Sequence, residues 1–317
     1  MSTTGKLTGV IPPVVTPLTQ DRRLDIESYE RLINRLIDAG VDGLFVLGST
    51  GEVAFSTDQL RGQIITEAVR IINGRVPLLA GVIDTQTARV LEHVKVAQDA
   101  GVNAIVATAP FYAITHTPQI KRHFEILADR AQVPIYAYDI PVCVHTKLDP
   151  DMLVELGRSG ALAGVKDSSG DDISFRRLSL KNRAAGEPLT LFTGHEFVVD
   201  GAYLSGAHGS VPGLSNVDPD GYVRMHRAFL AGDWDGLRTE QDRLAALMEI
   251  CLAAKGITGW GAGVGAFKTA LMLQGVITTN QVPEPFEALT GADVDAIRGI
   301  LDAVGPAAVR DTVTAGR

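Results

Sequence analysis

The sequence predicts an α/β protein of the (β/α)8 (TIM) barrel class with a C-terminal helical extension. Between Gly9 and Phe229, short apolar runs recur, and each is followed by a segment in which apolar residues have helical spacing. Several runs are apolar throughout, which is typical of a parallel sheet that is covered on both faces. Eight consecutive βα units favour a closed barrel over an open doubly wound sheet.

The first two units set the pattern for the rest. Residues 9–16 are predicted to form a strand in spite of their prolines, and residues 25–39 a helix that stops at Gly40. Residues 42–47 form the second predicted strand, and Thr57 caps the helix that follows it. The other six strands are predicted at residues 77–82, 103–108, 134–138, 162–166, 189–193 and 207–211.

The last part of the chain is predicted to be helical, over residues 237–254, 267–274 and 291–304. No Pro/Ser-rich or charged linker precedes it, so we expect a barrel of residues 1–231 and an extension of residues 232–317 that packs on it. A glycine-rich stretch, residues 259–265, invites a nucleotide-binding interpretation. Since no strand precedes it, a loop between helices is preferred.

The composition is that of a globular protein. Of 317 residues, 45% are hydrophobic and 21% are charged, which is ample for a large core. The formal net charge of −8 and the scattered Lys and Arg argue against a nucleic-acid partner, and no run is long enough to span a membrane. Cys143 and Cys251 have neither disulfide-framework nor zinc-site spacing. Without a secretory signal, we expect a cytoplasmic protein that holds no metal.

Active sites of such barrels form at the carboxyl ends of the strands. Lys166 ends the sixth predicted strand, where partial desolvation is expected to lower its pKa toward that of a nucleophile. The alternative is an ordinary lysine at the barrel rim that pairs with Asp167. Tyr138 ends the fifth strand, so the two side chains are expected to be neighbours, and a phenol beside a lysine can shuttle protons.

Two further strand ends carry candidate binding residues. The second strand ends in a turn of small and polar residues, Gly48, Ser49, Thr50, Gly51 and Glu52. Its backbone N–H groups can converge on an anion while Ser49 or Thr50 donates to it, although a glycine-rich turn without function is the alternative. Gly194 ends the seventh strand and would let a ligand approach the backbone closely. His195 and Glu196 follow it, and the alternative is that they merely begin a helix.

In these motifs the sequence resembles the pyruvate-dependent Schiff-base aldolases, a superfamily that includes dihydrodipicolinate synthase and N-acetylneuraminate lyase. The resemblance runs over nearly the whole chain and rests on the motifs at residues 48–52, 138–141, 164–167, 206–211 and 268–271. It implies that Lys166 forms an imine with pyruvate or another 2-oxo acid and that the protein is a class I aldolase, lyase or hydro-lyase. No cofactor is implied, because the protonated imine is the electron sink.

The same resemblance implies roles for other residues. Tyr138 would be the central acid/base, and Ser49 with Thr50 would bind the carboxylate and relay protons. Tyr112 matches a tyrosine that family members lend across a dimer interface, which implies a homo-oligomer, often a dimer of dimers. Val211 matches the position whose backbone carbonyl faces the lysine.

The sequence also departs from both familiar branches of this superfamily. Cys143 stands where synthase members carry an arginine for the aldehyde's carboxylate, and His145 is a candidate to take up an anionic or hydroxylated group instead. Ser49 is typical of the sialate lyase branch, but that branch has an acidic pair where this chain keeps only Glu196. Two alternatives stay open: an authentic dihydrodipicolinate synthase of lysine biosynthesis, and a non-catalytic 2-oxo-acid-binding or sensor protein on the same barrel.

Overall fold

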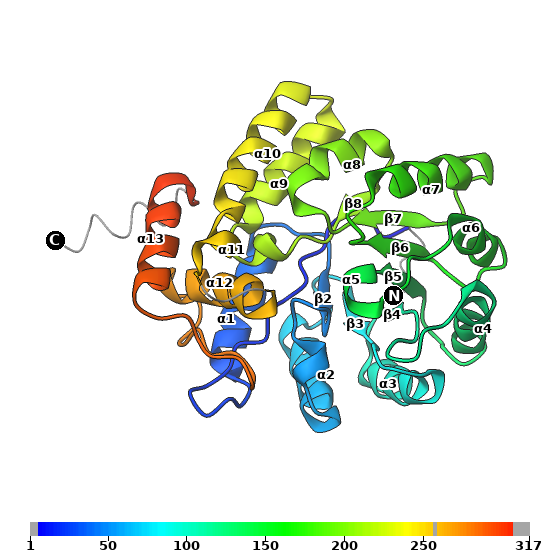
Figure 1. Cartoon of the computed structure of the whole chain (residues 1–317), viewed down its shortest axis with the longest axis horizontal. Helices are drawn as coiled ribbons and strands as arrows, with labels where there is room; N and C mark the ends of the chain where they lie inside the picture. Colours follow the sequence, from blue (N-terminus) through cyan, green and yellow to red (C-terminus); the bar gives the residue numbers. More distant parts are fainter. Residues whose placement is uncertain (1–5, 256–258, 307–317) are drawn as a thin grey trace.

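The computed structural model describes residues 6–255 and 259–306. They form one eight-stranded parallel sheet, curled on itself, with helices outside it and a group of C-terminal helices on one flank (Figure 1). The strands follow the order β1-β8-β7-β6-β5-β4-β3-β2. They are β1 (Gly9–Val10), β2 (Leu44–Val46), β3 (Leu78–Gly81), β4 (Ala104–Thr108), β5 (Ile135–Asp139), β6 (Gly164–Asp167), β7 (Thr190–Thr193) and β8 (Gly209–Ser210). The predicted barrel class is confirmed.

Helices alternate with these strands and then continue alone to the end of the described chain. Those of the barrel are α1 (Ile26–Asp38), α2 (Asp58–Ile72), α3 (Thr87–Ala100), α4 (Thr117–Ala128), α5 (Pro141–Val144), α6 (Pro150–Arg158), α7 (Asp172–Ala184), α8 (Val199–Ser205) and α9 (Pro219–Ala231). The flank holds α10 (Trp234–Met248), α11 (Ile250–Ala253), α12 (Trp260–Leu273) and α13 (Ala292–Val304). Short 3-10 turns lie at η1 (Val53–Phe55), η2 (Glu196–Val198) and η3 (Gly213–Asn216).

Strand β1 is much shorter than the predicted strand over residues 9–16, because Pro12 and Pro13 have no N–H to donate to a ladder. The chain still runs beside β2 past these prolines. Phe45 N donates to Pro12 O at 2.9 Å, and Val14 N donates to Phe45 O at 2.8 Å. These bonds join the first and second strands and close the sheet into a barrel.

Several predicted helix signals are confirmed. Thr57 caps α2 by accepting a hydrogen bond from Leu60 N at 3.2 Å, and Gly40 follows α1 with a φ of +87°. The predicted helix over residues 237–254 is instead divided into α10 and α11. None of the described helices has the length and apolarity needed to cross a membrane.

The loop predicted at residues 259–265 is wrong, because this stretch forms the first turns of α12. Glycine disfavours helices in isolation, but α12 is buried along most of its length, and packing overrides propensity. At Gly265 a Cβ would lie 3.6 Å from Leu289 Cγ, an ordinary contact distance, so the packing does not depend on this glycine. Its Lys268 is fully buried and bonds Glu52 of the barrel at 2.5 Å, which ties the extension to the barrel. The boundary at 231/232 stays a prediction, and residues 307–317 of the predicted extension lie outside the described ranges.

Candidate active site

Lys166 lies in β6 and turns into the barrel, where it is 6% exposed. It pairs in register with Tyr138 of the neighbouring strand β5. The Lys166 Nζ atom lies 3.7 Å from the centre of the Tyr138 ring and 5.7 Å from that of Phe45. The two strand-end side chains are therefore neighbours, as predicted from the alternation of strands.

The alternative of a rim lysine paired with Asp167 is wrong. Successive residues of a strand point to opposite faces, so Asp167 turns away from the side chain before it. Its carboxylate lies 3.4 Å from Lys147 Nζ and accepts a hydrogen bond from Ser169 N at 2.7 Å. The ion pair of Asp167 is thus made with Lys147, and Lys166 remains directed at the aromatic side chains of the barrel interior.

Tyr138 connects Lys166 to the turn after β2. Its side chain is 2% exposed, and its hydroxyl lies 3.2 Å from Ser49 Oγ, where either atom can donate. Thr50 is half-buried in the same turn. The turn packs tightly, because a Cβ at Gly48 would lie 2.5 Å from Phe45 Cε1 and a Cβ at Gly51 would lie 3.0 Å from Leu47 N. The glycines of this turn are required for packing, whatever they bind.

Gly194, at the end of β7, leaves room beside the lysine. A Cβ there would lie 2.1 Å from Ser168 Oγ and 3.4 Å from Lys166 Cε. Val211 is 5% exposed and lies alongside β7, since its N–H donates to Thr193 O at 2.8 Å. Gly194 therefore lies beside the side chain of Lys166, and Val211 continues the sheet next to β7.

This arrangement has relatives among known proteins. The family model described as the dihydrodipicolinate synthetase family matches residues 6–304. The chain belongs to the dihydrodipicolinate synthetase family. As a member, it is a lyase that acts on a 2-oxo acid through a Schiff base on a lysine.

Individual members of the dihydrodipicolinate synthetase family match most of the chain. The 4-hydroxy-tetrahydrodipicolinate synthase of Methanoculleus marisnigri is 34% identical over 242 residues, which are 76% of this chain and 82% of that protein. 4-Hydroxy-tetrahydrodipicolinate synthase 1 of Streptomyces coelicolor is 30% identical over 292 residues, with coverage of 92% and 91%. A solved prophage protein of the family from E. coli K12, in complex with pyruvate, superposes with a TM-score of 0.89 at 28% identity, with coverage of 95% and 99%.

Of the predicted specificity residues, Cys143 and Glu196 both lie near enough to Lys166 to be influenced by its charge. Cys143 is half-buried on α5, and burial raises the pKa of its thiol, although the charge of Lys166 acts in the opposite direction. His145 ends the same helix, is exposed and has a φ of +57°. The structure therefore brings Cys143 toward the site and leaves His145 facing solvent.

Glu196 does not lie free beside the substrate position. Its Oε2 accepts a hydrogen bond from Leu214 N at 2.8 Å, which fixes η2 to the turn after β8. Burial raises the pKa of this carboxyl group, while the N–H groups of Leu214 and Gly213 and the charge of Lys166 lower it. Its neighbour His195 instead faces Asp172, with 3.3 Å between Nδ1 and Oδ1.

Tyr112 is not brought to Tyr138 within the single chain. Its side chain is 93% exposed, and its backbone has a φ of +72°, which is unusual for a bulky residue. The role implied by resemblance to other family members, at the site of a neighbouring subunit, stays a prediction.

The sequence analysis missed Lys147 as a residue that supports the site. Asp139 and Asp167 follow Tyr138 and Lys166 directly and are paired across β5 and β6. Lys147 forms ion pairs with both, and Asp139 also accepts a hydrogen bond from Leu148 N at 3.1 Å. Burial, together with the charge of Asp167, raises the pKa of Asp139 to about 6. Two carboxylates beside the predicted catalytic pair were the signal, since buried charges require partners.

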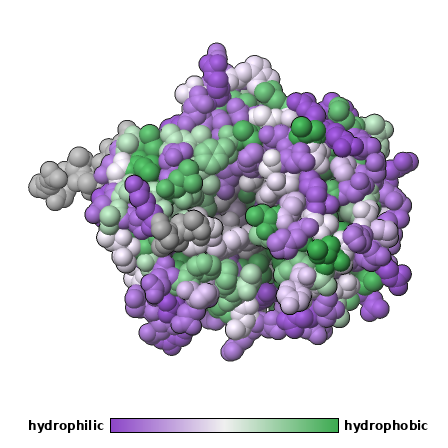
Figure 2. Space-filling view, in the orientation of Figure 1, coloured by the Kyte–Doolittle hydropathy of each residue, from purple (hydrophilic) through white to green (hydrophobic). Residues whose placement is uncertain are grey.

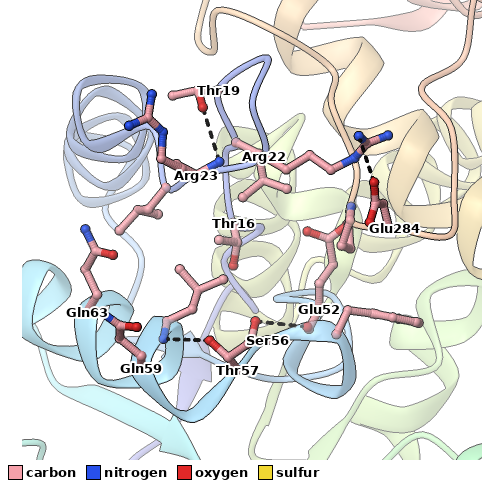
Figure 3. Close-up of a pocket in the computed structure, with 15 residues that line it drawn as sticks. Thr16, Thr19, Arg22, Arg23, Glu52, Ser56, Thr57, Gln59, Gln63 and Glu284 are labelled. Carbon is pink, nitrogen blue, oxygen red and sulfur yellow. Dashed lines mark hydrogen bonds and ion pairs between the residues drawn. The ribbon is translucent and has the colours of Figure 1, made fainter.

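A larger cavity of the described chain lies elsewhere. It measures about 750 Å³ and lies between the segment after β1 and helix α2, where Arg22, Arg23, Gln59 and Gln63 border it (Figure 3). It shares Glu52 with the turn after β2, but Lys166, Tyr138 and Ser49 are not among its lining residues. Ser49 instead lines a smaller cavity of about 240 Å³ together with Cys143, and this cavity adjoins the predicted catalytic residues through the contact of Ser49 with Tyr138.

Proposed function

We propose that Lys166 is the residue through which this chain performs the Schiff-base chemistry of its family. The observation that carries the proposal is the sequence of contacts from Lys166 Nζ to the Tyr138 ring, at 3.7 Å, and from the Tyr138 hydroxyl to Ser49, at 3.2 Å. A buried amine beside a phenol and a hydroxyl is the arrangement that imine formation needs, because protons must be supplied and removed at one carbonyl group.

The proposed reaction begins when the Lys166 amine attacks the keto carbon of a 2-oxo acid. The carbonyl oxygen leaves as water after two proton transfers, which Tyr138 and Ser49 are placed to mediate. The resulting iminium withdraws electrons, so that the bond at the adjacent carbon can break or form. We assign the substrate carboxylate to the N–H groups and hydroxyls of the turn formed by Gly48, Ser49, Thr50 and Gly51.

The wider setting of this chemistry is also proposed. The reaction needs no metal or organic cofactor, because the iminium itself accepts the electron pair. We propose a cytoplasmic homo-oligomer, a dimer of dimers, in which Tyr112 reaches a neighbouring site. Neither nucleic acid nor membrane is expected as a partner, since the net charge is −8.

Reduction of the imine tests the proposed function. The protein is incubated with pyruvate and sodium borohydride, and the adduct is located by peptide mass spectrometry. We expect a reduced adduct on Lys166, its loss in Lys166→Ala, and its retention in the matched control Lys95→Ala, which removes an exposed lysine. An adduct elsewhere would disprove the assignment, and no adduct at all would favour the alternative of a non-catalytic binding protein.

A second candidate is the synthase activity named in the relatives, 4-hydroxy-tetrahydrodipicolinate synthase. Against it stands Cys143, which provides no positive charge for an acceptor that carries a carboxylate. A coupled assay with pyruvate and an acceptor aldehyde that carries a carboxylate separates the synthase from an aldolase that cleaves hydroxylated 2-oxo acids. Condensation as efficient as the cleavage of hydroxylated 2-oxo acids would favour the synthase.

A further inference from the structure

A small cavity opens beside Ser49, between the turn after β2 and helix α5. It measures about 240 Å³ and is walled mainly by aliphatic and aromatic side chains, including Val53, Ile83, Phe111, Ile140, Val144 and Trp260. None of the described residues that line it is charged. In Figure 2, hydrophilic side chains dominate the periphery of the face, whereas apolar ones occur around its middle.

The cavity adjoins the predicted catalytic residues through two of its lining residues, although Lys166 and Tyr138 do not line it themselves. Ser49 Oγ lies 3.2 Å from the Tyr138 hydroxyl, and the Tyr138 ring lies 3.7 Å from Lys166 Nζ. Cys143 lines the same cavity and is near enough to Lys166 to feel its charge. The far end of a substrate bound to Lys166 can therefore extend past Ser49 and Cys143 into this cavity.

Two polar atoms at this cavity are left without partners. Thr108 Oγ1 and Trp260 Nε1 are buried, and neither has a hydrogen-bond partner among the described residues. Both residues line the cavity, and Thr108 is 3% exposed. Buried polar groups are nearly always satisfied, so these two atoms are expected to bond an oxygen of the bound substrate or a water molecule at the edge of the cavity.

The lining excludes a charged occupant on physical grounds. An anionic group in this cavity would lose its hydration and find no cation to replace it, because Lys147 is already held by Asp139 and Asp167. An apolar group loses nothing by entering. The size also fits, since a cavity of roughly 150 Å³ is enough to hold benzene.

We propose that this cavity receives the far end of the substrate and that this end is an uncharged alkyl or aryl group. The inference rests on the proposed function and adds the substrate class to it. The protein would then cleave 4-hydroxy-2-oxo acids whose C4 carries an apolar group, and it would release an apolar aldehyde together with pyruvate.

The cleavage balances without any further reactant. In the iminium on Lys166, the bond between C3 and C4 breaks, and its electron pair forms the enamine and neutralises the nitrogen. The proton of the C4 hydroxyl passes to the Tyr138 oxygen, and C4 becomes the aldehyde carbonyl. That proton then returns to C3, and water hydrolyses the imine to pyruvate and free Lys166.

The test uses the full-length wild-type protein and three 4-hydroxy-2-oxo acids that carry phenyl, isopropyl or carboxylate at C4. Pyruvate release is followed with lactate dehydrogenase. We expect kcat/KM for the phenyl or isopropyl compound to exceed that for the carboxylate compound by about tenfold or more, because one apolar group is worth at least this much in a fitted pocket. Equal or reversed values, or no cleavage of either apolar compound, overturn the inference.

A charge placed in the cavity provides the matched test. Cys143→Arg is expected to lower the preference for the apolar compounds by about tenfold or more, since it offers a partner to the carboxylate. Val142→Arg adds the same charge to the same helix at a position that is 79% exposed and is expected to leave the preference unchanged. If both variants shift it equally, the cavity does not determine specificity.

Borohydride trapping separates this inference from the proposed function. An adduct on Lys166 of the wild-type protein without any apolar preference refutes the substrate class alone. Absence of the adduct refutes the proposed function, and the substrate class with it. The wild-type panel decides the inference even if Cys143→Arg fails to fold.

Discussion

The contribution of Asp139 to the free energy of unfolding is expected to decrease as pH rises, whereas ion-paired aspartates usually contribute more at higher pH. Its side chain is fully buried, and burial with the nearby charge of Asp167 raises its pKa to about 6. In the unfolded chain an aspartate has a pKa of about 3.9. Between these values the native state binds more protons than the unfolded state, so the free energy of unfolding falls as pH rises and levels off above the folded pKa.

The magnitude follows from the difference of about two pKa units, which corresponds to about 3 kcal/mol. Lys147 does not add to this slope, because its pKa is raised by its acidic partners, against the effect of burial, and it stays protonated throughout the window. Asp139→Asn keeps an acceptor for Leu148 N but removes the titration. At pH 4 the unfolded chain is already partly protonated, so the stability of the wild type minus that of the variant should fall by about 2 kcal/mol from pH 4 to pH 7.

Urea denaturation at pH 4, 5, 6 and 7 and constant ionic strength measures this difference. Subtracting the variant removes the contributions of all other groups that the two proteins share. As a control, Asp302→Asn removes an exposed carboxylate and is expected to change the profile little. A difference that stays constant across the range, or that grows with pH, would refute the account of the buried Asp139, Lys147 and Asp167 cluster.

Three other predictions concern different parts of the molecule. Lys268→Met should lower the free energy of unfolding by about 3–5 kcal/mol, because Glu52 then remains buried without a positive partner. Adding Glu52→Gln should restore most of this loss. If urea denaturation shows that the effects of the two substitutions simply add, the prediction is contradicted. Burial opposes the charge of Asp84, but hydrogen bonds from His93, Thr85 and Arg89 lower its pKa to about 2. The wild type should therefore lose about 2 kcal/mol of its free energy of unfolding between pH 4 and pH 2 through this group. Asp84→Asn should abolish that loss, as measured by acid unfolding. Tyr112→Phe should slow turnover in the assembled protein, and wild-type kinetics would remove its proposed role.

The sequence predicted the barrel well because its signals are local. Apolar runs identify buried parallel strands, and polar residues mark the ends where side chains such as Lys166 and Tyr138 emerge. The prediction failed where non-local packing decides the outcome. Residues 259–265 carry weak helix formers, and burial against the rest of the extension makes them helical.

The site was predicted less completely than the fold. Lys147 lies in an irregular segment after α5, and only the folded chain shows that it reaches carboxylates on two neighbouring strands. Likewise, the resemblance to the aldolase superfamily predicted Cys143 at the substrate, but nothing in the sequence indicated that Ile83, Phe111 and Trp260 would enclose a space next to it. Residues from so many separate elements come together only through topology.

The bond between Lys268 and Glu52 has a consequence for how the protein is made. Glu52 adopts a left-handed conformation three residues after Ser49, and its carboxylate is buried against the ammonium group of α12. During synthesis the whole barrel emerges before that ammonium group is available. A nascent or truncated chain that ends at residue 231 would leave the turn after β2, where we propose that the substrate binds, without this ion pair, so we expect such fragments to be inactive. We therefore expect the proposed imine chemistry to begin only after α12 has been synthesised.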